Sequence, residues 1–292
     1  MRVFNKVFLI IGGLSIVAGI AFLTIGIGKY YYIYNSIDNN ETFEDKYENV
    51  KSLEIDVAYG NVTIKEGDSF HIEAYNIEKA SFSSTLENGV WKVEDDTGLN
   101  KELSGDFEFF DVDIPVNWVI WDEDKTSNIV ITIPSGFTAE NININIESGR
   151  ITADYLDTEE ADINVDVGYF QINNLIIHNK SYLTVGAGEM IIDTLNAKDI
   201  TIENGVGFIQ ASGSILGNSY VKSGLGAIKL SINGDKADYN YDIDCSLGSV
   251  KIDGYRYTDT TIHNDAKHNF FLECDVGSIT LDYTSDSKTV SE

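Results

Sequence analysis

The sequence has few basic residues, and this shortage limits the partners that the chain can bind. Its 292 residues include 20 Lys and Arg against 47 Asp and Glu, which gives a formal net charge of −27 at pH 7. Such a chain is a poor match for nucleic acid and for anionic lipid head groups. Metal cations, cationic peptides and basic protein surfaces are the favoured partners, although solubility outside a cell is a simpler explanation of the same charge.

Motifs for catalysis, metal binding and cofactor binding are also missing. The sequence contains no G-x-S-x-G or H-E-x-x-H, and its GAG, GVG and GLG triplets lack the strand-to-helix context of a dinucleotide site. Acid pairs such as Asp242 with Asp244 lack the ligand density of a calcium loop. The four histidines are scattered, at His71, His178, His263 and His268. We therefore expect no catalytic residues, no cofactor and no metal.

Long apolar runs are missing except at the N-terminus. There, Val7 to Ile27 carry no charge, and 21 helical residues suffice to cross a hydrocarbon core of about 30 Å. Arg2 and Lys6 precede this run, and the chain after residue 34 has a net charge of −30, so we expect the N-terminus to be cytoplasmic and the rest extracytoplasmic. A cleaved signal peptide is the alternative, but the run exceeds the usual length and no A-x-A site follows it.

The sequence thus predicts a single-pass anchor over residues 1–34, in which a tyrosine belt at residues 30–34 lies at the membrane interface. Residues 35–49 are polar and acidic without a sustained period, and we expect them to form a tether.

Glycine recurs in a regular pattern that sets the expected fold. Seven similar segments follow one another at intervals of 19, 20, 19, 19, 22 and 29 residues, and an earlier copy surrounds Gly60. Counted from each glycine, apolar or small residues fall at −5, −3, −1, +2 and +4, which predicts a strand that bends at the glycine with these positions inward. The seven reference glycines are Gly149, Gly168, Gly188, Gly207, Gly226, Gly248 and Gly277.

This repeat predicts an all-β protein, a parallel β-helix-like solenoid with coils of about 19–22 residues. A further apolar cluster in several coils, as at Leu156, Leu175 and Leu195, indicates a third, shorter face. Residues 141–284 are expected to form the regular solenoid and residues 285–292 a disordered tail. An antiparallel sandwich is the competing fold, but hairpins do not require a shared phase around a glycine. The handedness of the coil stays open.

The repeat also places the two cysteines, because both fall at position −3. The inward column contains Ile146, Val165, Val185, Asn204, Ser223, Cys245 and Cys274. Stacking in sequence order brings Cys245 and Cys274 within disulfide range, and an extracytoplasmic location permits oxidation. Buried free thiols are an equal alternative, because stacked parallel positions are not ideal for a bridge. Asn204 is expected to face inward in a polar ladder.

Residues 50–140 are less regular and are expected to form a β cap, which protects the open end of a solenoid from edge-to-edge aggregation. Within it, residues 96–128 depart from the pattern and mix aromatic with acidic residues. Aromatic residues on an insertion are candidate binding anchors, although they also serve to pack on the solenoid wall. The candidates are Phe107, Phe109, Phe110, Trp118 and Trp121.

Five motifs between residues 50 and 284 resemble the putative-adhesin β-strand-repeat domains of bacterial envelope proteins, especially those of Gram-positive bacteria. In order, they are EIDVAYGNVTI, NGVWKVEDD, ITIPSG, SGRITADYL and GVGFIQASG. The resemblance implies a scaffold and offers no catalytic residues. Some members of that family are linked to envelope-stress systems. The aromatic-acidic insert is a departure from the family pattern.

The leading functional hypothesis is a non-catalytic, surface-displayed solenoid that binds an envelope component or another surface protein. An extracytoplasmic sensor or modulator of envelope stress is one alternative. A carbohydrate-active enzyme is another, but the outward columns at −4 and +3 assemble no acid pair with a basic partner on any rung.

Overall fold

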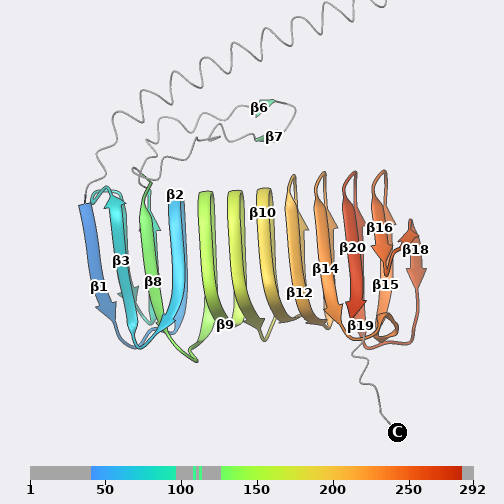
Figure 1. Ribbon diagram of the computed structural model, residues 1–292, viewed down its shortest axis with the longest axis horizontal. Helices are drawn as coiled ribbons and strands as arrows, with labels where there is room; N and C mark the ends of the chain where they lie inside the picture. Colours follow the sequence, from blue (N-terminus) through green and yellow to red (C-terminus); the bar gives the residue numbers. More distant parts are fainter. Residues whose placement is uncertain (1–40, 97–107, 110–111, 114–125, 285–292) are drawn as a thin grey trace, which may run out of the picture.

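The computed structural model describes residues 41–96, 108–109, 112–113 and 126–284. These residues form an all-β stack of coils, which lie side by side along the long axis in Figure 1. Eighteen strands belong to one continuous sheet, and β6 (Glu108–Phe109) pairs separately with β7 (Val112–Asp113). The predicted β-solenoid is confirmed.

The predicted membrane segment and the tail lie outside the described residues. Within the part that the structure describes, no helix is both long and apolar enough to cross a membrane. The helical element found there is a 3₁₀ turn, η2 (Lys236–Asp238).

The middle of the stack is built from coils that follow each other in sequence. The strands are β9 (Thr138–Ile177), β10 (Ser181–Lys198), β11 (Ile200–Asn204), β12 (Phe208–Leu216), β13 (Asn218–Ser223) and β14 (Ala227–Asn233). Their pairing is parallel and in register, so that Val185 lies between Val165 and Asn204. The inward residues at −5, −3, +2 and +4 are buried, and the third apolar cluster, which includes Leu175 and Leu195, is buried as well.

Glycine is required at the bend because successive bends stack too closely for a side chain. A Cβ atom added to Gly188 would collide with the carbonyl oxygen of Gly168, and one added to Gly207 would collide with that of Gly188. These glycines form one edge of the solenoid, which we call the glycine-corner edge and which is the upper edge in Figure 1.

The prediction that position −1 faces inward is wrong for the later coils. Val206, Leu225, Val276 and Leu247 are exposed by 56%, 64%, 52% and 81%. The backbone turns at these residues and its amides continue the hydrogen-bond ladder, as when Val206 N donates to Gly186 O at 2.7 Å and Leu225 N to Gly205 O at 2.8 Å. The side chains therefore point out of the corner, in a row that we call the apolar ridge.

At the C-terminal end the coils do not stack in sequence order. The last coil, β19 (His268–Cys274) and β20 (Ser278–Thr284), lies between the β13–β14 coil and the coil of β15 (Tyr239–Cys245) and β16 (Ser249–Ile252). The reason is the segment between them, because β17 (Tyr255–Tyr257) and β18 (Thr260–Ile262) pair antiparallel with β16 and β15. The penultimate coil in sequence is thus the outermost coil in space.

The N-terminal end has the same inversion. The coil of β2 (Ser52–Gly67) pairs with β9, and the later coil of β5 (Val90–Asp95) and β8 (Asn128–Pro134) lies outside it. Two antiparallel strands, β3 (Phe70–Ile77) and β4 (Phe82–Glu87), then pair with β8 and β5. Antiparallel strands therefore border both outermost coils.

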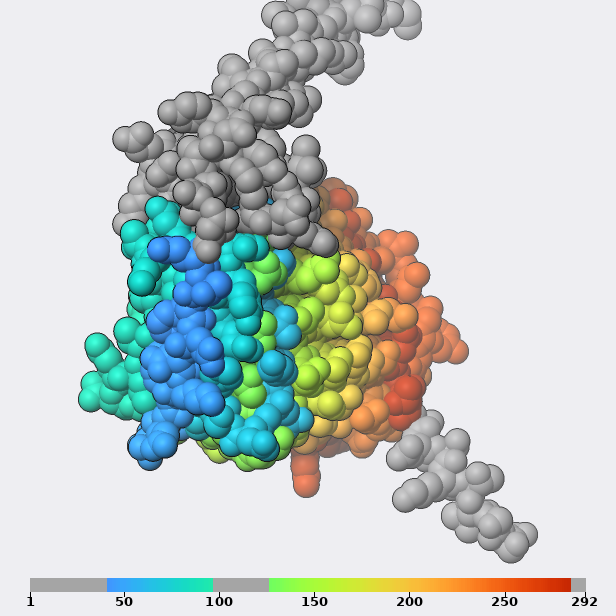
Figure 2. Space-filling view, turned by 60° about the vertical axis from the view of Figure 1, so that its left-hand side comes forward, coloured from blue at the N-terminus to red at the C-terminus, as the bar shows by residue number. Residues whose placement is uncertain are grey.

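Residues 41–47, which were expected in the tether, instead form the edge strand β1 (Glu41–Tyr47), paired antiparallel with β3. Figure 2 shows this strand in blue across the near end of the stack. The strand forms because its aromatic residues cover the cap: the rings of Phe43 and Phe82 are 5.2 Å apart, and those of Tyr47 and Trp91 are 5.0 Å apart. The Tyr47 hydroxyl also donates to Ser84 O at 2.8 Å.

Candidate binding surface

The aromatic-acidic insert leaves the solenoid at the glycine-corner edge. Its segment between Asp96 and Thr126 joins the end of β5 to the start of β8, where the outermost coil would otherwise have its glycine bend. Ser127 is buried against the neighbouring corner, since Asn61 N donates to Ser127 O at 2.8 Å and Ser127 Oγ donates to Tyr59 O at 3.2 Å. The insert therefore replaces one corner of the stack.

One of the predicted binding residues falls on a described strand. Phe109 belongs to β6, where it lies opposite Val112, while Glu108 lies opposite Asp113. Phe107, Phe110, Trp118 and Trp121 lie outside the described residues. The role of these five residues in binding stays a prediction.

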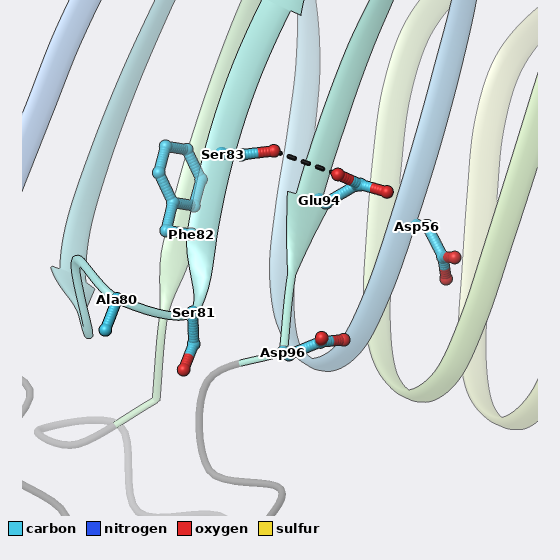
Figure 3. A pocket seen from close by; sticks show the side chains of 7 residues that line it. All are labelled: Asp56, Ala80, Ser81, Phe82, Ser83, Glu94 and Asp96. Atoms are coloured by element: carbon cyan, nitrogen blue, oxygen red, sulfur yellow. Dashed lines mark hydrogen bonds between the residues drawn. The ribbon is translucent and has the colours of Figure 1, made fainter.

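An open acidic hollow lies beside the root of the insert. Three carboxylates line it, from Asp56 on β2, Glu94 on β5 and Asp96 just after the end of β5, as Figure 3 shows. Its other lining residues are Ala80, Ser81, Phe82 and Ser83. The sequence analysis did not find this hollow, because only the unforeseen pairing of β2 with β5 brings Asp56 opposite Glu94.

Glu94 is the carboxylate of this hollow that has a cationic partner. Lys92 Nζ lies 2.8 Å from Glu94 Oε1 and 3.2 Å from Glu54 Oε1, and Ser83 Oγ donates to Glu94 Oε2 at 3.0 Å. The bond from Lys92 and then that from Ser83 lower the pKa of the Glu94 carboxyl, against the opposing effect of burial. The carboxyl group is therefore ionised at neutral pH.

An acid–amide row continues from the hollow along the outer face. Asn145 Nδ2 donates to Asp56 Oδ1 at 3.0 Å, and Asn164 Nδ2 donates to Asn145 Oδ1 at 3.0 Å and to Asp166 Oδ1 at 2.9 Å. Glu147 has a raised pKa because of its burial first, and then because of the negative charges of Asp56, Asp166 and Asp96. This end of the surface thus favours cationic groups and hydrogen-bond donors.

The inserted last coil creates an ion pair that the sequence analysis did not foresee. Lys222 Nζ lies 2.8 Å from Glu273 Oε1, and the Tyr220 hydroxyl donates to Glu273 Oε2. The bond from Lys222 is the largest cause of the lowered pKa of the Glu273 carboxyl. A glycosidase general acid needs a raised pKa, so Glu273 fits a structural ion pair better than that role.

Three of the four histidines have separate partners. His71 Nε2 lies 3.1 Å from Glu44 Oε1, His178 Nε2 lies 2.8 Å from Asp157 Oδ1, and His268 Nδ1 accepts a hydrogen bond from Gly217 N at 2.9 Å. Among the residues that the structure describes, no group of three or more His, Cys, Asp or Glu side chains could hold a metal ion.

The two cysteines lie directly opposite each other in register, Cys245 against Cys274, and both are buried free thiols. Burial is the main cause that raises the pKa of the Cys274 thiol to about 11. Their column also contains Asn204, which is inward as predicted. However, its amide donates to Gly207 O at 2.9 Å rather than to a stacked asparagine.

The described residues define a class: a β-solenoid of parallel coils whose two ends are bordered by antiparallel strands. The chain belongs to the Toastrack DUF4097 family, whose model matches residues 50–282. This confirms the resemblance to the putative-adhesin β-strand-repeat family that the sequence motifs carry. No curated protein matches the chain.

Solved structures from two bacteria are similar to the chain over most of its length. A putative adhesin from Bacteroides fragilis is 12% identical over 82% of this chain and 96% of its own, with a TM-score of 0.41. A putative cell adhesion protein from Clostridium sporogenes is 10% identical over 84% of this chain and 99% of its own, with a TM-score of 0.37.

Proposed function

We propose that this protein is a non-catalytic binding module displayed on the cell surface, where it binds an envelope component or another surface protein. The observation that carries the proposal is the position of the insert. The solenoid is a stacked, hydrogen-bonded scaffold, and its aromatic-acidic insert leaves from one corner beside three carboxylates. Binding residues on loops held by a rigid scaffold are a common arrangement in recognition proteins.

The chemistry of this corner favours a partner with both basic and apolar groups. The insert residues Phe107, Phe109, Phe110, Trp118 and Trp121 would provide the apolar anchors. Asp56 and Asp96, on the rim of the hollow, would attract a basic group and speed the encounter.

We further propose that residues 1–34 anchor the protein in the cell membrane, with the N-terminus in the cytoplasm. The described fold begins at Glu41, 14 residues after the apolar run ends at Ile27. This spacing supports an arrangement in which the N-terminal cap, with the root of the insert, lies close to the membrane and the C-terminal coils lie farther from it.

The test is recovery of envelope components by the full-length chain from detergent-solubilised membranes and from purified cell wall. Replacing the five insert aromatics with alanine should lower recovery of a specific partner by at least about tenfold, since aromatic anchors dominate most interfaces. The matched control is Tyr182→Ala, which removes an exposed aromatic ring from the outer face of β10.

High salt separates specific binding from charge attraction. A partner that persists at high salt and is lost with the insert aromatics supports the proposal. Recovery that is unchanged by the five substitutions, or that disappears for every variant at high salt, contradicts the proposed role of the insert. Product release from purified wall polymers would contradict the non-catalytic assignment.

A further inference from the structure

The outer face of the C-terminal coils has an exposed aromatic ring. Phe271 lies on the inserted strand β19, opposite Tyr220 of β13 on one side and Asp242 of β15 on the other. Its neighbours in the strand, Phe270 and Leu272, are buried, whereas Phe271 is 42% exposed. The outward residues of these three strands around Phe271 form a surface that we call the Phe271 patch. The inserted last coil creates this patch, because it brings β19 between β13 and β15.

A row of amides borders the patch on one side. Asn269 Nδ2 donates to Asn218 Oδ1 at 2.7 Å, and Asn240 Nδ2 donates to Asn269 Oδ1 at 2.9 Å. These bonds hold three carboxamides in line across the strands. Asn218 is exposed, and the ladder bond uses its oxygen, so its amide nitrogen can donate to a ligand.

Carboxylates border the patch elsewhere. Asp242 and Asp244 are exposed on β15, beside Phe271 and Glu273 of the neighbouring strand. Glu273 already balances the ammonium of Lys222, whose Nζ lies 2.8 Å from Glu273 Oε1. The charge of the patch is therefore that of Asp242 and Asp244, and it attracts a cationic group.

The size and chemistry of the patch fit a short saccharide. Three strands span about 10 Å, and three outward residues along each strand span about 13 Å. A pyranose ring has C–H groups on its face, which pack on an aromatic ring, and hydroxyl groups at its rim, which bond to amides and carboxylates. A second copy of the chain is a poor occupant, since each copy carries a net charge of −27.

We propose that the Phe271 patch binds an amino sugar whose amine is free. The sugar ring packs on Phe271, and a hydroxyl group accepts a hydrogen bond from the Asn218 amide. The ammonium group lies toward Asp242 and Asp244. This proposal names one class of envelope component and so rests on the proposed binding function, but it uses a different surface. In Figure 1, β19 and β15 lie at the opposite end of the stack from β8, where the insert joins the cap.

Tyr182 lies on the same outer face but outside the patch. It is exposed by 42%, as Phe271 is, but Lys180 Nζ lies 5.1 Å from the centroid of its ring, so this ring already has a cationic partner. Thr201, on the strand between them, separates Tyr182 from Tyr220. Tyr182→Ala is therefore a matched control for Phe271→Ala.

The experiment is a calorimetric titration of the full-length chain with the β-1,4-linked disaccharide of glucosamine. At about pH 6 both the amines and the carboxylates are charged. The fully N-acetylated disaccharide has the same rings without the charge, and it should bind at least about fivefold more weakly. Dilysine has the charge without the rings, and it should also bind at least about fivefold more weakly.

Variants of the patch test the named residues. Phe271→Ala should weaken binding of the glucosamine disaccharide at least about fivefold, whereas Tyr182→Ala should bind it as the unchanged chain does. Asp242→Asn keeps the shape of the side chain and should reduce the preference for the free amine at least about threefold. Circular dichroism confirms that each variant is folded.

Three results would overturn the proposal. The first is equal affinity for the two disaccharides, and the second is binding that Phe271→Ala leaves unchanged. The third is equal affinity for dilysine, which would identify a general attraction for cations or a basic peptide as the occupant. Recovery of an envelope partner through the insert aromatics, without disaccharide binding, would overturn this proposal and leave the proposed function standing.

Discussion

From the coil that begins at Ala161 to Asn233, each coil stacks on the coil that precedes it in sequence, whereas at both ends the spatial order of two coils is inverted. In the middle, the alternation along each strand and the glycine bend fix which residues face inward, so each coil pairs in register with the next. At each end, an antiparallel strand pairs with the outermost coil, where a further parallel coil would otherwise stack. The middle is therefore a local repeat, and the ends depend on pairing between distant segments.

The largest expected effect tests the close stacking of the middle bends. Gly188→Ala should destabilise the protein by about 4 kcal/mol or prevent folding, because the added Cβ collides with a backbone oxygen that cannot move. Gly254→Ala is the control from the C-terminal end, where φ is 77° but nothing lies within 4 Å of the added atom. It should cost only about 1 kcal/mol. Urea unfolding followed by circular dichroism measures both, and similar costs would contradict the account of the corner.

The next effect tests whether β1 belongs to the fold. Replacing both Phe43 and Tyr47 with alanine should lower the free energy of unfolding by about 2–3 kcal/mol, since both rings pack on the cap. Thr42→Ala changes an exposed residue of the same strand and should alter stability by less than about 0.5 kcal/mol. If residues 41–47 were a tether, the double substitution would change the free energy of unfolding as little as the control does.

A smaller effect tests the inverted order of the last coils. Lys222→Glu should destabilise the protein by about 1 kcal/mol, because it places two carboxylates together at Glu273. Adding Glu273→Lys should restore most of this loss in a double-mutant cycle. If Glu273→Lys restored none of the loss, Lys222 would not lie beside Glu273, and the insertion of the last coil next to β13 would be contradicted.

The same difference between middle and ends explains what could be predicted from the sequence. Ile163, Val165, Phe170 and Ile172 are inward as expected, because alternation in a buried strand fixes the face of each residue. Position −1 was assigned wrongly because a bend breaks this alternation, and a turn can expose an apolar residue such as Leu247 without changing its sequence pattern.

The ends were harder to predict because period and spacing do not encode which distant strand pairs with which. The interval of 29 residues before Gly277 signalled an insertion, but it did not show that β17 and β18 would pair with the coil before them. The acidic hollow was missed for the same reason. It depends on β2 lying beside β5, although 37 residues lie between Asp56 and Glu94 in the sequence and β3 and β4 intervene.

The smallest effect concerns pH, and two carboxylates in different parts of the stack should respond with opposite signs. Glu273, in the inserted coil, has a lowered pKa, so its ionised form stabilises the fold above pH 4.5 and this contribution is lost as the pH falls below that value. Glu147, in the regular middle, has a raised pKa, so its ionised form opposes folding, and acidification toward pH 4.5 relieves this penalty.

Substitution by glutamine separates the two cases, because it removes the charge and keeps the shape. At pH 7, Glu273→Gln should lower the free energy of unfolding and Glu147→Gln should raise it, each by less than about 1 kcal/mol because both groups are partly solvated. Both differences should shrink when urea unfolding is repeated at pH 4. A Glu147→Gln variant that is less stable than the parent at pH 7 would contradict this account, because it would show that burial and the nearby carboxylates of Asp56, Asp166 and Asp96 do not make the Glu147 charge oppose folding.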